Sequence, residues 1–265
     1  MNAATLSRIG LWAMLSIFVV CSLWVIFGVF GVHEPDVRTG SFVTNASISG
    51  QPALSPHFAP ANDAPAVSEL ASLPSGNAQR VSTQWAASAA AATGIPLRAL
   101  TGYAGAALAL ATETPSCHLG WTTLAAIGNI ESGHGTHANS SISADGVTRP
   151  PIYGPLLDGS QFAAVADTDA GQFDFNTQFD RAVGPLQFIP STWALWGADG
   201  NGDGVKDPQQ IDDAALATGR YLCHYGDLSG AEGWRRAVFA YNHVDVYVDS
   251  VAATANTYDQ RMGQL

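Results

Sequence analysis

Apolar positions recur at helical spacing from about residue 79 to the end of the chain. This pattern predicts helices near residues 80–92, 96–112, 118–132, 208–225 and 231–256. Pro96 suits the first turn of the second helix, and Gly133 can end the third. Strand signals are sparse, and the stretch 133–190 is rich in Gly, Asp, Pro and aromatic residues, which predicts a long irregular segment of the kind that lines binding sites. We therefore expect one mainly α domain over residues 79–265.

A different pattern marks the beginning of the chain, where an apolar run from Ile9 to Val32 contains no charged residue. As a helix it would be about 36 Å long, against a hydrocarbon core of about 30 Å. Arg8 precedes the run and Glu34 and Asp36 follow it, so the charge bias places the amino end in the cytoplasm. We expect a single-pass membrane anchor with the remaining chain extracytoplasmic. The alternative is a signal peptide, cleaved at the weak candidate site Val29-Phe30-Gly31, which would release a secreted protein.

Residues 33–78 are rich in Pro, Ser, Ala and Asn, with few large apolar side chains and no clear period. This composition predicts a flexible linker that holds the folded part away from the membrane. The alternative is filler whose length has not been selected.

The charge balance bears on partners more than on fold, because the chain carries a net charge of −11 at pH 7. It has no basic stripe, so we expect no nucleic-acid partner. A polymeric ligand would have to be held by hydrogen bonds and stacking, for which seven Trp residues are available. Trp121, Trp193 and Trp196 are the candidates, although each could instead pack in the core. We expect no organic cofactor, and the sequence names no protein partner.

Cysteine usage supports export. Cys21 lies in the apolar run, which leaves Cys117 and Cys223 as an even pair in the folded part. In an oxidising compartment these two can form a disulfide. Two reduced cysteines buried in the core are the alternative.

One acidic residue occupies an unusual position near the end of the helix predicted at 118–132. Helical spacing places Leu124, Ile127, Gly128 and Glu131 on one stripe, so the carboxyl group projects from the face that should be buried. Desolvation and the negative end of the helix dipole both raise the pKa of such a group. A carboxylic acid that stays protonated near neutral pH can act as a general acid. The alternative is a helix that ends sooner and leaves Glu131 solvated.

Three short motifs give this glutamate a context. Glu131-Ser132, Gly184-Pro185-Leu186-Gln187 and Ala240-Tyr241-Asn242 follow one another in the chain. Their order and spacing resemble the Glu-Ser, Gly-Leu-Met-Gln and Ala-Tyr-Asn motifs of lytic murein transglycosylases. The run from Arg181 to Trp193 is most similar to the membrane-bound B family of these enzymes. The resemblance covers about residues 95–260, and it implies a lysozyme-like α domain that cleaves the MurNAc–GlcNAc bond of peptidoglycan.

The resemblance also implies roles for these residues. Glu131 would first protonate the leaving oxygen and then, as a carboxylate, remove the proton from the sugar's own 6-hydroxyl, which closes a 1,6-anhydro ring. The substrate's N-acetyl group would stabilise the oxocarbenium-like state in place of a second carboxylate. Gln187 would contact an N-acetyl group, Tyr241 would bond to Glu131 or the sugar, and Asn242 would orient the local backbone. Core packing is the alternative for Tyr241 and Asn242, and a simple cap is the alternative for Ser132.

Two rival functions remain open. A lysozyme-like hydrolase would need a second carboxylate to activate a water molecule opposite Glu131. A non-catalytic wall-binding scaffold would need only the groove. The candidates for the second carboxylate are Asp145, Asp167, Asp169, Asp174 and Asp180.

A second site is predicted where oxygen-bearing residues alternate around Gly204 in the pattern that begins an EF-hand loop. Hard oxygen ligands suit Ca²⁺, and we assign the ion a structural role. The twelfth position holds Gln210 rather than Glu, so Asp207, Asp212 or Asp213 would supply the missing charge. An acidic turn without an ion is the alternative. The expected ligands are Asp199, Asn201, Asp203, the Val205 carbonyl and Asp207.

His134 and His137 follow Glu131 closely, but they lie in a Gly-rich stretch with no third ligand near in sequence, so they do not form a zinc signature. We expect both to be surface residues or part of a substrate loop.

Overall fold

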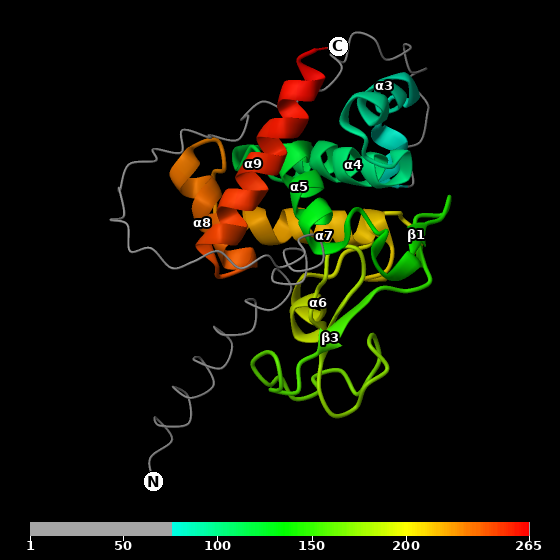
Figure 1. Ribbon diagram of the computed structural model, residues 1–265. Helices are drawn as coiled ribbons and strands as arrows, with labels where there is room; N and C mark the ends of the chain where they lie inside the picture. The colour runs from blue at the N-terminus through cyan, green and yellow to red at the C-terminus, as the bar shows by residue number, and fades with distance from the viewer. Residues whose placement is uncertain (1–75, 265) are drawn as a thin grey trace, which may run out of the picture.

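The computed structural model describes residues 76–264. The predicted anchor at 9–32 and nearly all of the linker at 33–78 lie outside the described residues. Within the described range, no helix combines the length and the apolar character needed to cross a membrane. The helices are α3 (Thr83–Thr93), α4 (Leu97–Glu113), α5 (Trp121–Ser132), α6 (Pro190–Trp196), α7 (Ile211–Cys223), α8 (Ala231–Tyr241) and α9 (Asp245–Met262) (Figure 1).

The first four predicted helices match α3, α4, α5 and α7 to within a few residues at each end. The prediction of one last helix over 231–256 is wrong, because α8 and α9 are separate elements. Between the two helices, Asn242 and Val244 have extended backbone conformations, with φ of −144° and −130° respectively. The break allows α9 to fold back against α8 and to pack along α5.

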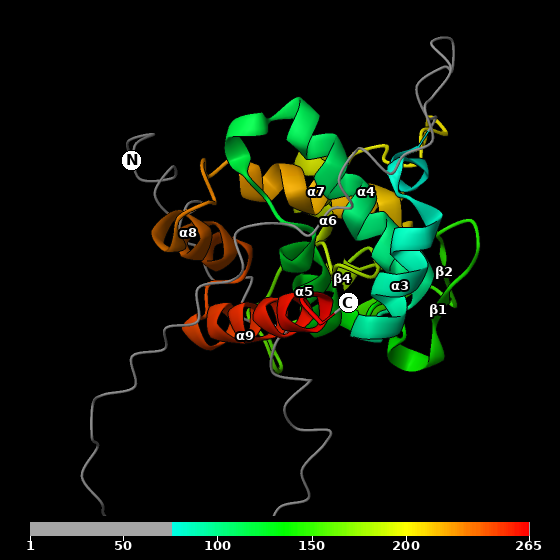
Figure 2. The same ribbon diagram turned by 90° about the horizontal axis from the view of Figure 1, so that it is seen from above.

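Helix α5 lies at the centre of the domain, with α9 along one side and α4 and α7 along the other (Figure 1 and Figure 2). Every residue of α5 is buried except Asn129, which is half-buried. Gly128 permits the close approach of α4, since a Cβ atom there would lie 2.0 Å from the Tyr103 hydroxyl oxygen. The neighbouring helices therefore exclude water from α5, the helix that carries Glu131.

A disulfide joins Cys117, directly before α5, to Cys223 at the end of α7, with a Cα–Cα distance of 5.2 Å. The predicted pairing is confirmed. It closes a loop of sequence separation 106, and such a long closure restricts the unfolded chain strongly.

The segment between α5 and α6 is irregular, as the sequence predicts, and contains only short strands in two antiparallel pairs. The strands are β1 (Ser141–Ile142), β2 (Thr148–Arg149), β3 (Tyr153–Leu156) and β4 (Arg181–Val183). The part around β3 forms the lower end of the molecule in Figure 1 together with α6, while β1 lies at the right, at the height of α7. Asp carboxylates replace regular pairing in the longest loop of this segment, where Asp169 accepts backbone N–H groups from Gly171 and Phe173.

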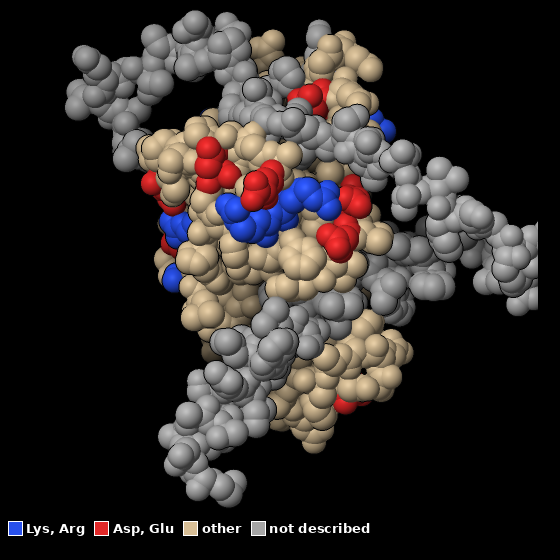
Figure 3. Space-filling model, turned by 90° about the vertical axis from the view of Figure 1, so that its left-hand side faces the viewer, with Lys and Arg blue, Asp and Glu red and all other residues tan. Residues whose placement is uncertain are grey.

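The molecular face in Figure 3 carries basic side chains in a short band with acidic side chains around them. Ion pairs of this kind join α8 to α9, where Arg235 lies 3.7 Å from Asp245 and 2.7 Å from Asp249. Pairs as exposed as these contribute little to stability, so the two helices are held mainly by their apolar contacts.

Candidate active site

Glu131 is the penultimate residue of α5, and its side chain is turned into the protein with 7% exposure. The helix ends where the sequence predicts, at Gly133, whose φ of 57° is left-handed. The N–H groups of Gly133 and His134 donate to the carbonyls of Asn129 and Gly128, each at 2.9 Å, and so complete the last turn. This end geometry fixes the carboxyl group on the buried side of α5.

The hydrogen-bond partner of this carboxyl group is Tyr247, whose hydroxyl donates to Glu131 Oε1 at 2.7 Å. Tyr247 is 2% exposed and belongs to the first turn of α9. Burial raises the pKa of Glu131 to about 7, and the bond from Tyr247 lowers the pKa by a smaller amount because it favours the charged form. Near neutral pH the group therefore exists in both protonation states, as a residue that gives and then takes a proton requires.

Ser132 connects the end of α5 to the motif around Gln187. Its hydroxyl donates to the Pro185 carbonyl at 2.6 Å and accepts the Gly135 N–H at 2.8 Å. These two backbone partners correspond to the capping alternative. They also place the Glu131-Ser132 motif against the turn that presents Gln187.

The turn at Gln187 is rigid and conformationally strained. Gln187 has a φ of 50°, which is left-handed and unusual for its residue type, and its Nε2 donates to the Gly184 carbonyl at 2.8 Å. Gly184 has a φ of 80° and lies so close to Pro208 that a Cβ atom would be 1.8 Å from the proline carbonyl oxygen. Only glycine fits there, so the backbone conformation that aims Gln187 is fixed.

The third motif braces the same turn from the opposite side. Tyr241 is the last residue of α8, and its hydroxyl donates to the Leu186 carbonyl at 2.6 Å. Asn242 caps the end of α8 and is buried. The three motifs thus meet at one place in the fold, with Tyr241 and Asn242 at the end of α8.

Tyr247 is the site residue that the sequence reasoning missed. In a continuous helix over 231–256, Tyr247 would lie along the extended axis of α8. The observed α9 runs in a different direction. Only the break after Asn242 turns Tyr247 toward Glu131. Nothing in the helical period marks that break, so spacing contains no signal for this contact.

For two of the three candidate tryptophans the core alternative holds, and one of the two histidines is not at the surface. Trp121 and Trp193 are buried in the core and present no face for stacking, because both pack within the main apolar cluster. Trp196 is half-buried and packs edge-on against Tyr221. His134 is also buried, contrary to the surface placement expected for it, while His137 is exposed as expected.

In the candidate metal loop, the side chains of Asp199 and Asp203 fold toward the loop's own backbone. Asp199 accepts N–H groups from Gly202 and Gly204, and Asp203 accepts the N–H of Val205 at 2.7 Å. Both carboxylates therefore bond to the backbone of their own loop.

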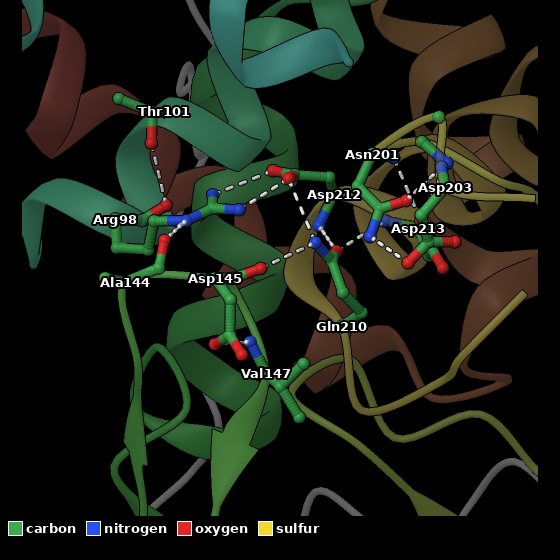
Figure 4. A network of polar contacts seen from close by, with 12 residues as sticks. Arg98, Thr101, Ala144, Asp145, Val147, Asn201, Asp203, Gln210, Asp212 and Asp213 are labelled. Carbon is green, nitrogen blue, oxygen red and sulfur yellow. Dashed lines mark hydrogen bonds and ion pairs between the residues drawn. The ribbon is translucent and has the colours of Figure 1, made fainter. Parts of the chain in front are cut away.

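Gln210, Asp212 and Asp213, which follow this loop, form hydrogen bonds and ion pairs with different partners (Figure 4). Gln210 does not act as a twelfth-position ligand, since its side chain caps α7 by accepting the N–H groups of Asp212 and Asp213. Asp212 forms an ion pair with Arg98 of α4. Asp213 faces the loop instead, and accepts the N–H groups of Gly200 at 2.7 Å and Asp207 at 2.9 Å. Of Asp212 and Asp213, only Asp213 bonds to the backbone of this loop.

The carboxylates considered for a hydrolase have other partners. Asp145 is exposed and pairs with Arg149, with an N–O distance of 2.7 Å. Asp174 is buried and accepts the N–H groups of Asn176 and Arg181, both at 2.9 Å. Oxygen atoms of the remaining three lie within 4.8 Å of one another in the loop between β3 and β4. These are Asp167, Asp169 and Asp180.

A comparison with protein families gives one match. Residues 162–250 match a family described as the transglycosylase SLT domain. The matched segment includes the Gln187 turn, Tyr241 and Tyr247, whereas Glu131 and Ser132 precede it. No curated protein and no solved structure matches the chain. The match supports a murein-degrading enzyme of the lytic transglycosylase and lysozyme-like superfamily, with a domain that binds peptidoglycan.

The raised pKa of Glu131 has a consequence for stability. Its pKa is about 7 in the folded chain against an ordinary value of 4.5, so the folded state binds the proton more tightly. Stability must then fall as the pH rises from 4.5 through 7, by roughly 3 kcal/mol in total. We predict that Glu131→Gln is more stable than the wild type at pH 8 by about this amount and equal to it at pH 4. Urea unfolding at both pH values measures the difference, with the exposed Glu232→Gln as control. An equal difference at both pH values would contradict the prediction.

We predict that the Tyr247 hydroxyl determines the pH above which activity declines. Tyr247→Phe removes a bond that favours the carboxylate, so the pKa of Glu131 should rise further. A bond to a charged group contributes about 1.5–3 kcal/mol, which corresponds to about one pH unit or more. The alkaline limb of the pH–rate profile for muropeptide release should therefore move upward by about one unit. Tyr225→Phe is the control, because it removes a hydroxyl in the turn after α7 that lies 3.4 Å from the Tyr221 hydroxyl. A limb that stays in place in Tyr247→Phe would refute the role of Tyr247.

Proposed function

We propose that this chain is an extracytoplasmic lytic transglycosylase that cleaves the MurNAc–GlcNAc bond of peptidoglycan and leaves 1,6-anhydroMurNAc ends. The observation that carries the proposal is the Glu131 carboxyl, buried at the end of α5 with a pKa of about 7 and bonded to Tyr247. A membrane anchor at 9–32 and a linker at 33–78, nearly all of which lie outside the described residues, complete the proposal.

The reaction requires one group to act as both acid and base. Protonated Glu131 donates its proton to the glycosidic oxygen as the bond to the MurNAc anomeric carbon breaks. The resulting carboxylate accepts a hydrogen bond from Tyr247 and then removes the proton of the MurNAc 6-hydroxyl. The 6-oxygen bonds to the anomeric carbon, which closes the anhydro ring and returns the proton to Glu131. No water molecule is consumed.

The environment of Gln187 suits a contact to an N-acetyl group. An amide can both donate to and accept from the acetamido group of a sugar. The strained turn from Gly184 to Gln187 is held by Ser132 on one side and by Tyr241 on the other. A turn fixed from two sides holds the amide in one orientation relative to Glu131, which favours a positioned contact over a flexible one.

The surroundings of three of the five candidate second carboxylates favour the lyase over the hydrolase. A water-activating base needs an oxygen directed at the sugar. Asp174 and Asp180 are instead buried acceptors for backbone and side-chain groups of their own loop, and Asp145 is paired with Arg149. These carboxylates hold the loop together.

Mass spectrometry of purified sacculi treated with the full-length protein tests the reaction. We predict anhydro-muropeptides from the wild type and from the control Glu232→Gln, and a loss of at least 100-fold for Glu131→Gln, because a lost general acid typically costs this much. Products heavier by one water would establish the hydrolase. Binding to sacculi without any release would establish the scaffold.

We also propose that the loop from Asp199 to Asp207 binds a structural Ca²⁺. The proposal is supported by a donor set that is all oxygen and by the carboxylates of Asp199 and Asp203, which bond to the backbone of their own loop. Asp213 lies behind them and supports the backbone at Gly200 and Asp207. Asp207 and Asn201 provide further oxygens, and the Val205 carbonyl completes the set that the sequence predicts.

Thermal unfolding of the EDTA-treated protein tests this site. We predict that Ca²⁺ at about 100 times its Kd raises Tm by roughly 5–10 °C, because binding at that excess stabilises by about 2.7 kcal/mol. Mg²⁺ should have a smaller effect, and Asp203→Ala should abolish the response while Asp158→Ala, in a different loop, preserves it. An unchanged Tm in the wild type would rule out the site.

A further inference from the structure

A buried polar chain runs behind the candidate active site, and the proposed reaction does not use it. The imidazole of His134, 6% exposed, lies between two tyrosine hydroxyls. Its Nδ1 is 3.3 Å from the Tyr103 hydroxyl oxygen, and its Nε2 is 2.9 Å from that of Tyr258. Both tyrosines are buried, and they come from α4 and α9 respectively. Polar groups enclosed in a core are costly unless every member has a partner, and in this chain each does.

The backbone directs His134 inward. Gly133 and His134 are both left-handed, with φ of 57° and 60°, and the His134 N–H bonds back to the Gly128 carbonyl. The imidazole consequently lies beneath the end of α5 rather than in solvent. A left-handed histidine is an uncommon conformation, and such outliers concentrate where the surrounding structure holds a functional group in place.

The chain links the helices that determine the surroundings of Glu131. Tyr247 and Tyr258 are eleven residues apart on α9, which is about three helical turns, so both project from the same face. Tyr247 contacts Glu131, and Tyr258 contacts His134, which follows Glu131 by three residues in the sequence. Two tyrosines of α9 therefore hold two points at the end of α5. Tyr103 adds a third attachment, from α4, where Gly128 makes room for its ring.

We infer that His134 is a positioning residue for the proposed reaction, which locks the end of α5 to α9 and so sets the hydrogen bond between Glu131 and Tyr247. The inference rests on the proposed function for its effect on rate, while its effect on the Glu131 carboxyl is independent of activity. Loss of the link should let α9 shift relative to α5, which lengthens the Tyr247–Glu131 bond and leaves the substrate contacts at the Gln187 turn in place.

Four variants of the full-length chain test this role. Tyr258→Phe and His134→Leu remove the link to α9, whereas His134→Gln retains an amide that can bond to Tyr258. Thr123→Val is the matched control, because it removes a buried hydrogen bond from the opposite end of α5, where Thr123 accepts from Trp234 Nε1 at 3.0 Å.

Titration of the Glu131 carboxyl, followed by ¹³C NMR, is the first measurement. Tyr258→Phe and His134→Leu should raise its pKa by about half a unit or more, because a weaker bond from Tyr247 favours the carboxylate less. His134→Gln should restore the wild-type value, and Thr123→Val should not change it. In the background of Tyr247→Phe, Tyr258→Phe should cause no further shift, as expected when one residue acts through the other.

Kinetics with sacculi are the second measurement. The two link-breaking variants should lower kcat about tenfold with KM within twofold of the wild type. A wild type that releases no muropeptide would refute the proposed function, and the NMR titration would then decide the positioning role alone. Titration curves that match the wild type in Tyr258→Phe and His134→Leu, or shifts that add to that of Tyr247→Phe, would overturn the inference and leave His134 as a packing residue.

Discussion

Burying a carboxyl group at the end of a helix is unfavourable unless a proton or a hydrogen bond compensates for the lost water. Glu131 has both, since burial raises its pKa to about 7 and Tyr247 donates to it. The rest of the domain is arranged around this requirement. Helix α5 is enclosed by α4, α7 and α9, and Gly128 and Gly133 provide the close approach and the left-handed end that the enclosure needs.

The motifs that lie far apart in sequence are joined through backbone carbonyls. Ser132 donates to Pro185, and Tyr241 donates to Leu186, so the turn that carries Gln187 is held between the ends of α5 and α8. Positions fixed by main-chain contacts are less dependent on side-chain flexibility. A substrate that enters beside this turn would therefore meet a preorganised amide and a preorganised acid, which is the arrangement that lowers the entropic cost of reaction.

Much of this site follows from residue patterns, and the remainder depends on three-dimensional geometry that patterns do not contain. The stripe of Leu124, Ile127 and Gly128 predicts the burial of Glu131, and Gly133 predicts the end of the helix. Tyr247 could not be predicted, because the break that redirects it lies at Asn242 within an uninterrupted helical period. His134 could not be predicted either, since a residue after a helix end is normally solvated and only two successive left-handed residues turn it inward. Outside the active site, the helix cap formed by Gln210 and the placement of Asp213 behind the loop could be known only from the fold.

The protonation state of Glu131 near neutral pH is the claim on which the account depends. Infrared difference spectra between the wild type and Glu131→Gln would observe it directly through the carbonyl stretch of a protonated acid. With a pKa of about 7, the band should be strong at pH 6, where about 90% of the group is protonated, and nearly absent at pH 8.5. A difference spectrum without this band at pH 6 would show that Glu131 ionises as an ordinary solvated glutamate and would contradict the account.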